Sequence, residues 1–331
     1  MLADHNGRRR RNEDTGIVAM LPSPFHNALV LSGPTGSGKT SLGIELAQRL
    51  DAEIISMDSM ALYRGMDIGT AKPTPAERAI VPHHLIDVRE PWESASVAWW
   101  LDEAKRCVAE IEARGKQALF VGGTPLYLKA LLCGLFEGPP ANDELRQRLI
   151  EEARVHGSEV LHRRLASVDP VCAERLHPND VRRIVRALEV HELTGKPMSA
   201  WQTQWPAASE QHADTDSLLS AVVWLDWPRA ELYARINRRV DEMFAAGLVE
   251  EVRRLRALDR PLSHEALQAL GYKEIYAFLD GQVTLDETIV LVKTRSRNFS
   301  RRQIGWFRHL PECRSVSNEL TFTLWQSKMD R

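Results

Sequence analysis

Gly33-Pro34-Thr35-Gly36-Ser37-Gly38-Lys39-Thr40 is the stretch that decides the fold of this 331-residue chain. Its glycine spacing lets the backbone curl so that successive N–H groups converge on anionic oxygens, and a helix that follows adds its positive N-terminal end. In this pattern the lysine reaches the outer phosphate and the threonine hydroxyl is placed to hold Mg²⁺. The motif predicts a cradle for a phosphate compound but does not say which compound.

The residues around the cradle fit the strand and the helix that such a loop joins. Short apolar runs then alternate with amphipathic helical segments, which predicts βαβ units and a mainly parallel sheet. We expect a P-loop NTPase-like α/β fold whose ligands gather at the carboxyl ends of the strands. The expected strands are 28–31, 52–56, 84–88, 117–121 and 219–225, and the expected core helices are 41–50, 94–113 and 229–246.

Composition describes an ordinary globular protein, with 44% hydrophobic and 27% charged residues. The net charge is −2, so a nucleic-acid surface would have to be a local patch. No apolar run approaches the ~18 residues of a membrane span, and we expect a cytoplasmic protein. The cysteines show no C-x-x-C spacing, which favours reduced thiols over a disulfide framework or a zinc site. They are Cys107, Cys133, Cys172 and Cys313.

Changes of character along the chain predict its domains. Residues 1–25 contain four consecutive arginines without periodic apolar positions, and we expect a disordered basic tail. Residues 26–138 and 216–315 are assigned to the P-loop α/β core. Residues 139–215 carry charged helical segments and are assigned to an α-helical insertion. Its expected helices are 143–155, 158–167, 170–176 and 180–193.

Candidate chemical residues follow two of the expected strands. Asp58 and Thr124 stand at strand ends, beside the cradle. From the sequence alone, Asp58 is equally a Mg²⁺ ligand, a general base or a turn-capping residue. Arg235 lies in an expected helix, where most arginines are simply solvated.

A basic segment, 293–308, carries six cationic side chains and no acidic one, with Phe299, Trp306 and Phe307 among them. Such charge attracts phosphate backbones and such aromatic faces stack on unpaired bases, which indicates RNA binding. The alternative is a solvated basic helix that rests its aromatic residues on the core. A second cluster, Arg182-Arg183-Ile184-Val185-Arg186, lies in the insertion.

Further motifs accompany the cradle over about residues 28–308. They are Asp58-Ser59, Tyr63-Arg64-Gly65-Met66-Asp67-Ile68-Gly69-Thr70-Ala71-Lys72-Pro73, Val121-Gly122-Gly123-Thr124-Pro125-Leu126-Tyr127, His177-Pro178-Asn179-Asp180 and Gly271-Tyr272. Together these residues resemble the tRNA dimethylallyltransferase family, also called tRNA isopentenyltransferases, in its bacterial form. The family often has Ala-Lys at Ser300-Arg301 and usually threonine at Gly305, so the resemblance is not complete.

The resemblance implies transfer of a dimethylallyl group from dimethylallyl diphosphate to N6 of adenosine 37 in tRNA, next to the anticodon. It implies that the donor diphosphate lies on the cradle with Lys39 and a Thr40-bound Mg²⁺. It makes Asp58 the base, Thr124 its neighbour at the reacting centre and Arg235 a second cation on the diphosphate. We also expect a monomer. Prenylation of free adenine nucleotides and a P-loop kinase activity are the alternatives.

The same resemblance implies a set of tRNA contacts in both parts of the chain. They are Asp58, Ser59, Met60, Ala61, Arg146, Arg182, Arg183, Ile184, Val185, Arg186, Gln268, Ala269, Leu270, Gly271, Tyr272, Lys273, Arg301, Arg302, Gln303, Ile304, Gly305, Trp306, Phe307 and Arg308.

Overall fold

The computed structural model describes residues 24–135, 138–201, 222–316 and 325. The chain divides into two compact units, one formed by Met1–Leu131 with His212–Arg331 and the other by Leu132–Gln211. The basic tail expected at 1–25 lies outside the described residues apart from its last two positions.

The first unit is built on one six-stranded sheet in the order β3-β2-β4-β1-β5-β6, and every neighbouring pair is parallel. This confirms the predicted parallel α/β fold. Strands β1, β2 and β5 are buried along their whole length, as continuous apolar runs in a sheet covered on both faces require. The strands are β1 Leu29–Ser32, β2 Ala52–Ser56, β3 His83–His84, β4 Gln117–Gly122, β5 Val222–Leu225 and β6 Cys313–Val316.

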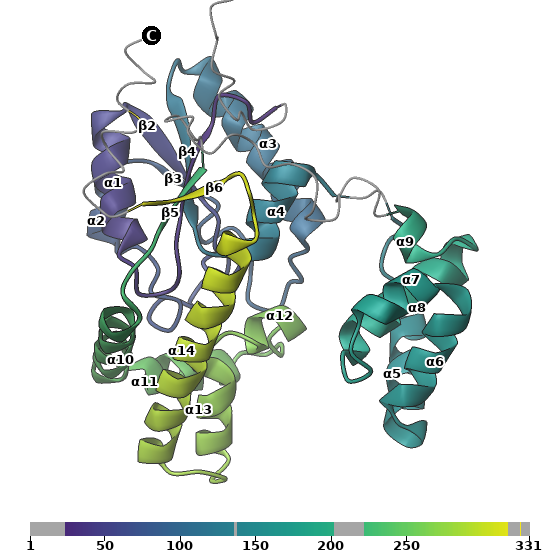
Figure 1. The fold of residues 1–331 in the computed structure, drawn as a ribbon. Coiled ribbons are helices and arrows are strands. Elements are labelled where there is room, and N and C mark those ends of the chain that lie inside the picture. Colours follow the sequence, from purple (N-terminus) through teal and green to yellow (C-terminus); the bar gives the residue numbers. More distant parts are fainter. Residues whose placement is uncertain (1–23, 136–137, 202–221, 317–324, 326–331) are drawn as a thin grey trace, which may run out of the picture. The chain divides into compact units, whose positions relative to one another are not determined.

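Helices flank this sheet, with α1 and α2 on one side and α3 and α4 on the other (Figure 1). On the first side, α1 contributes Ile44, Leu46 and Ala47 to a hydrophobic core that it shares with β1, β2 and β5. On the other side Trp100 of α3 stacks on Tyr127 of α4, with ring centroids 4.1 Å apart. The bounds are α1 Lys39–Arg49, α2 Pro75–Ile80, α3 Val97–Ala113 and α4 Pro125–Cys133.

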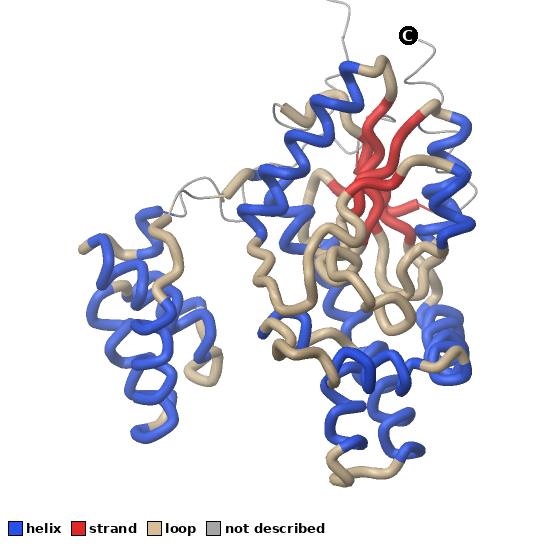
Figure 2. The backbone as a smooth tube through the Cα atoms, turned by 180° about the vertical axis from the view of Figure 1, so that it is seen from behind, coloured by secondary structure: helices blue, strands red, loops and turns tan. Residues whose placement is uncertain are grey.

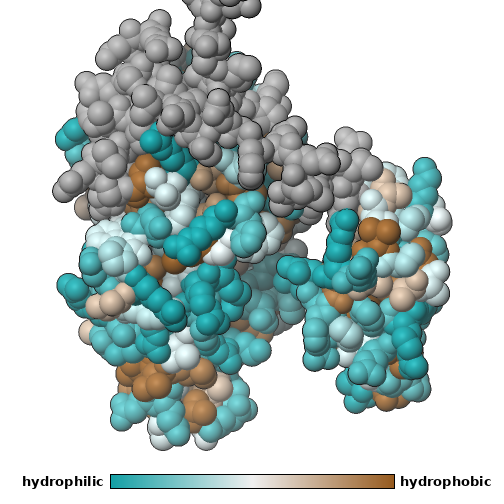
Figure 3. Space-filling view, in the orientation of Figure 1, coloured by the Kyte–Doolittle hydropathy of each residue, from teal (hydrophilic) through white to brown (hydrophobic). Residues whose placement is uncertain are grey.

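The remaining helices of the first unit gather beyond one end of the strands, on the side of the long tan loops in Figure 2. Among them α14 starts at a capping box formed by Thr284 and Glu287. Figure 3 shows hydrophilic side chains over much of the middle of α14 and hydrophobic ones near its first turns, where Leu285 and Val290 are exposed. The bounds are α10 Arg229–Ala245, α11 Leu248–Arg256, α12 His264–Leu267, α13 Tyr272–Leu279 and α14 Leu285–Arg308.

The second unit is a small helical bundle with its own core, in which Leu149, Leu161, Leu165 and Leu188 are fully or almost fully buried. Asp180 caps α8 by accepting a hydrogen bond from the Arg183 N–H, and a left-handed Gly195 ends it. The helices are α5 Asp143–His156, α6 Ser158–Val168, α7 Pro170–Arg175, α8 Val181–Thr194 and α9 Met198–Trp201.

One strand prediction was wrong in extent. The run 84–88 forms only the end of the two-residue strand β3, because Leu85 and Asp87 adopt left-handed backbone conformations, with φ of 59° and 56°. Asp87 instead accepts hydrogen bonds from Lys72 and Arg78, at 2.7 and 2.6 Å. Of the run 219–225, positions 219–221 lie outside the described residues, and β6 was not expected.

Candidate active site

The cradle loop joins β1 to α1 as its glycine spacing predicts. Gly36 and Gly38 have φ of 81° and 87°, which L residues with a side chain rarely adopt. Gly38 also precedes the first turn of α1, and no side chain caps this helix. The N–H groups at its positive N-terminal end can therefore bind an anion.

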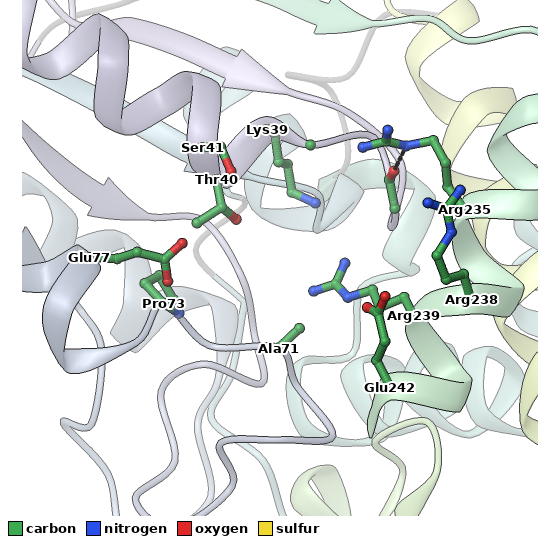
Figure 4. Close-up of a pocket in the computed structure, with 12 residues that line it drawn as sticks. Lys39, Thr40, Ser41, Ala71, Pro73, Glu77, Arg235, Arg238, Arg239 and Glu242 are labelled. Atoms are coloured by element: carbon green, nitrogen blue, oxygen red, sulfur yellow. Dashed lines mark hydrogen bonds between the residues drawn. The ribbon is translucent and has the colours of Figure 1, made fainter. Parts of the chain in front are cut away.

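A cavity of about 460 Å³ opens in front of the cradle. Figure 4 shows Lys39 from α1 and Arg239 from α10 pointing into it from opposite sides. Arginines, carboxylates and the loop after β2 complete a strongly polar wall. The lining residues are Gly36, Gly38, Lys39, Thr40, Ser41, Ala71, Pro73, Glu77, Arg235, Arg238, Arg239 and Glu242.

Electrostatics in this cavity favour an anion. Burial lowers the pKa of Lys39 from 10.5 to about 8, while the Asp58 carboxylate acts in the opposite direction and Arg239 adds to the lowering. Burial also lowers the pKa of Arg239, and Asp58 opposes that shift too. The cradle lysine, Arg239 and Asp58 therefore share one electrostatic environment, in which an added diphosphate would compensate two cations.

Arg235, the arginine singled out in the sequence, lies against the cradle itself. Its Nε donates to the Gly36 carbonyl at 2.8 Å (Figure 4). Its guanidinium also stacks on the Trp227 ring, 4.4 Å from the ring centroid. The Trp227 indole in turn donates to the Ser37 carbonyl at 3.0 Å. Arg235 therefore braces the loop.

Arg239 is the residue that sequence reasoning missed. It lies one helical turn after Arg235 on α10, so both side chains project from the same face. No hydrogen bond or ion pair joins its guanidinium to another residue in the part of the chain that the structure describes. The i, i+4 spacing of the two arginines was the available signal.

Asp58 and Thr124 lie side by side at the ends of β2 and β4, as predicted. The Ser59 N–H donates to Thr124 Oγ1 at 3.0 Å, and the Thr124 N–H donates to the Met57 carbonyl at 3.2 Å. Asp58 Oδ1 accepts from the Met60 N–H at 2.9 Å. Thr124 thus holds the residues on both sides of Asp58, and among the described residues no hydrogen bond occupies the second carboxylate oxygen of Asp58.

The loop between Tyr63 and Pro73 reaches the cavity because buried charges hold it. Lys72 donates to the Tyr63 carbonyl, to Asp67 and to Asp87, each at 2.7 Å. On the other side Glu251 accepts from three successive backbone N–H groups, at 2.8 to 3.2 Å, and from the Tyr272 hydroxyl at 2.6 Å. Those N–H groups belong to Asp67, Ile68 and Gly69.

The residues of the first unit expected to contact tRNA fall into three exposure groups. The exposed ones are Gln268, Lys273, Arg301, Arg302 and Arg308. Half-buried are Asp58, Ser59, Met60, Leu270, Ile304, Gly305 and Trp306. Buried are Ala61, Ala269, Gly271, Tyr272, Gln303 and Phe307. The last group can serve RNA binding only by holding the others in place.

The expected RNA residues of the second unit divide in a similar way. Arg182 and Arg183 are exposed, and Arg183 pairs with Asp180 at 3.3 Å. Arg146 and Arg186 both pair with the fully buried Glu189, at 2.9 and 2.6 Å. Ile184 and Val185 are buried in the bundle core. The solvent-facing part of this predicted patch is therefore the first turn of α8.

Over the described ranges, no group of three or more His, Cys, Asp or Glu side chains is arranged to hold a metal ion. The Thr40 hydroxyl points into the cavity, and within these ranges it has no hydrogen-bond partner (Figure 4). A hard cation that keeps most of its waters and takes phosphate oxygens as ligands would fit this single protein oxygen. No disulfide joins the four cysteines, and none of the described helices is long and apolar enough to cross a bilayer.

Comparisons with known proteins agree with this arrangement. The IPP transferase family model matches residues 61–310, and the isopentenyl transferase model matches residues 26–90. A tRNA dimethylallyltransferase of Geobacter metallireducens is 48% identical over 280 residues, which are 85% of this chain and 89% of that protein. One of Geobacillus kaustophilus is 48% identical over 284 residues, covering 85% and 87%.

Solved structures resemble the fold as well. The tRNA isopentenylpyrophosphate transferase of Bacillus halodurans superposes with a TM-score of 0.62 at 39% identity, over 92% of this chain and 94% of that one. A eukaryotic dimethylallyltransferase acting on tRNA gives 0.68 at 27% identity, over 92% and 76%. A family model that covers most of the chain and relatives at 48% identity lead to one conclusion: this chain belongs to the IPP transferase family.

Proposed function

We propose that this chain transfers the dimethylallyl group of dimethylallyl diphosphate to N6 of adenosine 37 in tRNA. The products are diphosphate and N6-dimethylallyladenosine. The observation that carries the proposal is the placement of Asp58 beside the cradle: Thr124 holds both neighbours of Asp58, and a Cβ added at Gly123, the residue before Thr124, would lie 3.4 Å from Lys39 Nζ. Membership of the IPP transferase family supports the same reaction.

The donor diphosphate lies on the cradle in this proposal. The loop N–H groups and the N-terminal end of α1 bind its oxygens, Lys39 neutralises its charge, and Arg239 faces it from α10. Arg235 keeps the loop in shape through its bond to Gly36. As the C–O bond to the diphosphate breaks, these groups stabilise the negative charge that develops on the leaving oxygen.

The acceptor amine approaches from the side of Asp58 and Thr124. The adenine N6 forms a bond to C1 of the dimethylallyl group, the C1–O bond breaks, and one N6 proton passes to Asp58 as general base. Asp58 is suited to this step because Thr124 fixes its neighbours, and because one of its oxygens has no hydrogen-bond partner in the described part of the chain. An adenine stacked in an RNA loop has to be turned out of its stack to reach this position.

Mg²⁺ is part of the proposal, and the Thr40 hydroxyl would be its protein ligand. The Thr40 hydroxyl in the cavity wall, which has no hydrogen-bond partner among the residues that the structure describes, fits this assignment. When bound, the ion would add positive charge to the leaving diphosphate.

RNA phosphates are proposed to bind the exposed arginines Arg301, Arg302 and Arg308 of α14 and the exposed arginines Arg182 and Arg183 of α8. The buried members of the expected set then act as supports for these surfaces. We propose a cytoplasmic protein. A monomer would suffice for this reaction, because the first unit holds both the cradle and Asp58.

An assay with purified chain tests the proposal. An unmodified anticodon stem-loop with adenosine at position 37 is incubated with dimethylallyl diphosphate and Mg²⁺, and its nucleosides are analysed by mass spectrometry. We expect dimethylallyladenosine, and none when position 37 carries guanosine. Modification of free AMP in place of the stem-loop, or phosphate transfer from ATP, would replace the proposal by one of the alternative activities.

A further inference from the structure

Gln303 occupies a place that RNA contact does not explain. Its side chain is only 3% exposed, although it lies on the basic helix α14. The Thr35 N–H donates to its Oε1 at 2.8 Å, and its Nε2 donates to the Gly123 carbonyl at 2.6 Å. A backbone N–H only donates and a carbonyl only accepts, so one orientation of the amide satisfies both. Gln303 thus joins the cradle loop to the turn after β4.

Gly123 provides independent support for this close meeting. A Cβ added there would lie 2.7 Å from Gln303 Nε2, 2.7 Å from the Gly33 carbonyl oxygen and 3.4 Å from Lys39 Nζ. The absence of a side chain at this position lets helix α14, the cradle and the β4 turn approach one another. A shift of α14 would therefore change the shape of the cradle directly.

The next residue extends this connection to the proposed base. The Thr124 N–H donates to the Met57 carbonyl, and Thr124 Oγ1 accepts from the Ser59 N–H, so Thr124 is hydrogen-bonded to both neighbours of Asp58. A movement of the Gly123 carbonyl moves the Thr124 peptide with it. Gln303 therefore contacts the cradle directly at Thr35, and it is connected to Asp58 through the Gly123–Thr124 peptide and the hydrogen bonds of Thr124.

The other end of the connection faces the proposed RNA surface. Arg301 and Arg302 directly precede Gln303 and are exposed, while Arg308 is exposed further along the same helix. Between them Phe307 is fully buried and packs on Trp224 of β5, with ring centroids 5.6 Å apart. The helix thus presents phosphate-binding groups outward and the Gln303 amide inward.

We infer that Gln303 is a positioning residue that couples RNA docking on α14 to the donor cradle and to Asp58. This inference rests on the proposed function, since it takes α14 as the RNA surface and the cradle as the diphosphate site. RNA bound to the arginines holds α14 in the position in which both Gln303 bonds form, and the diphosphate needs the same cradle shape. Each ligand then raises the affinity for the other by the same factor.

Binding of inorganic pyrophosphate with Mg²⁺ measures this coupling without turnover. Its dissociation constant is determined by calorimetry with and without saturating anticodon stem-loop RNA. For the wild type we expect RNA to tighten pyrophosphate binding by about fivefold or more, the lower range of common coupling. In Gln303→Met, which keeps the side-chain length but loses both hydrogen bonds, the ratio should fall to about one, the value for uncoupled sites.

Matched variants exclude a general loss of structure. Gln48→Met places the same change on the exposed face of α1 and should keep the wild-type ratio. Gln303→Asn retains an amide but is too short to span both partners, so it should also lose the coupling and serves if the methionine variant does not fold. In a folded Gln303 variant, kcat should fall, and the RNA Michaelis constant at saturating donor should rise by about the coupling factor that is lost. The dissociation constant of the RNA without donor should stay within about twofold of wild type, because the arginines are unchanged.

Two results would overturn the inference. One is that RNA does not change the pyrophosphate dissociation constant of the wild type. The other is that RNA tightens pyrophosphate binding in both Gln303 variants as much as in the wild type. The proposed function fails by a different result, namely the absence of dimethylallyl transfer by the wild-type chain. Because pyrophosphate binding requires no turnover, the two failures are distinguishable.

Discussion

Thr124 Oγ1 accepts a hydrogen bond from the Ser59 N–H at 3.0 Å, so a side chain at the end of β4 fixes the backbone that carries Asp58 at the end of β2. These strands are parallel neighbours, and their ends therefore meet at the same edge of the sheet. In the proposed reaction, this geometry places Asp58 as the base next to the cradle.

Replacing Thr124 by valine keeps the shape of the side chain and removes this acceptor. The Ser59 N–H then loses its partner, and we expect kcat to fall by about tenfold. This corresponds to an activation free energy that is higher by roughly 1.4 kcal/mol. Thr124→Ser retains the hydroxyl and should remain within about twofold of wild type on the same grounds. Single-turnover kinetics with saturating RNA would check both, and equal rates for valine and wild type would contradict this role.

The lowered pKa of Lys39 makes pyrophosphate binding depend on pH. With a pKa of about 8, the lysine is charged below that pH and loses its proton as the pH rises through it. Affinity for inorganic pyrophosphate should therefore decline from about pH 7 to about pH 9 beyond the change caused by the ligand's own titration. Lys39→Arg stays protonated and controls for the ligand. A constant ratio of wild-type to Lys39→Arg affinity across this range would contradict the prediction.

Removal of Arg239 should have two linked effects. Arg239→Ala loses a charged partner of the diphosphate, and we expect its affinity to weaken by roughly 10- to 100-fold. Because Arg239 contributes to the lowered pKa of Lys39, the alkaline decline should also move to higher pH in this variant. Arg254→Ala, an exposed change on α11, provides the control in the same calorimetric titration. Weaker binding with an unmoved pH profile would place Arg239 away from the lysine.

Salt dependence separates the arginines of α14 from its aromatic residues. If Arg301 and Arg302 bind RNA phosphates, changing both to alanine should reduce the slope of log affinity against log salt by roughly 0.7 to 0.9 for each contact. Trp306→Ala should weaken binding without changing the slope, because a stacking or packing loss releases no counterions. Filter binding of the anticodon stem-loop at several salt concentrations gives these slopes. An unchanged slope in the double variant would contradict phosphate contacts by Arg301 and Arg302 and leave Arg308 and α8 as the candidates.

The parts of the site that the sequence predicts are those fixed by local chemistry. Gly33 to Thr40 requires its glycines wherever such a loop occurs, and Asp58 and Thr124 follow strands whose apolar runs are visible in the sequence. Their meeting then follows from parallel strand order alone.

The parts that the sequence does not predict depend on tertiary packing. Gln303 reaches Thr35 across 268 positions of sequence, and only the docking of α14 on the sheet decides that its amide points inward. Arg235 and Arg239 are indistinguishable as helix arginines until α10 packs against the cradle. Leu85 resembles a strand residue, yet the buried charge of Lys72 holds the neighbouring Asp87 in a turn.

Asp58 is proposed to take a proton from N6 of adenosine 37 while a donor in the cradle transfers its dimethylallyl group, and tRNA nucleosides from a living host test this role most directly. A host that lacks its own enzyme would be complemented with the wild-type chain or with Asp58→Asn, and its bulk tRNA analysed by mass spectrometry. The wild type should restore dimethylallyladenosine. The asparagine variant, slowed by about 10²- to 10⁴-fold but with unchanged RNA affinity, should leave it strongly reduced. Full modification by Asp58→Asn, or none by the wild type, would contradict this account.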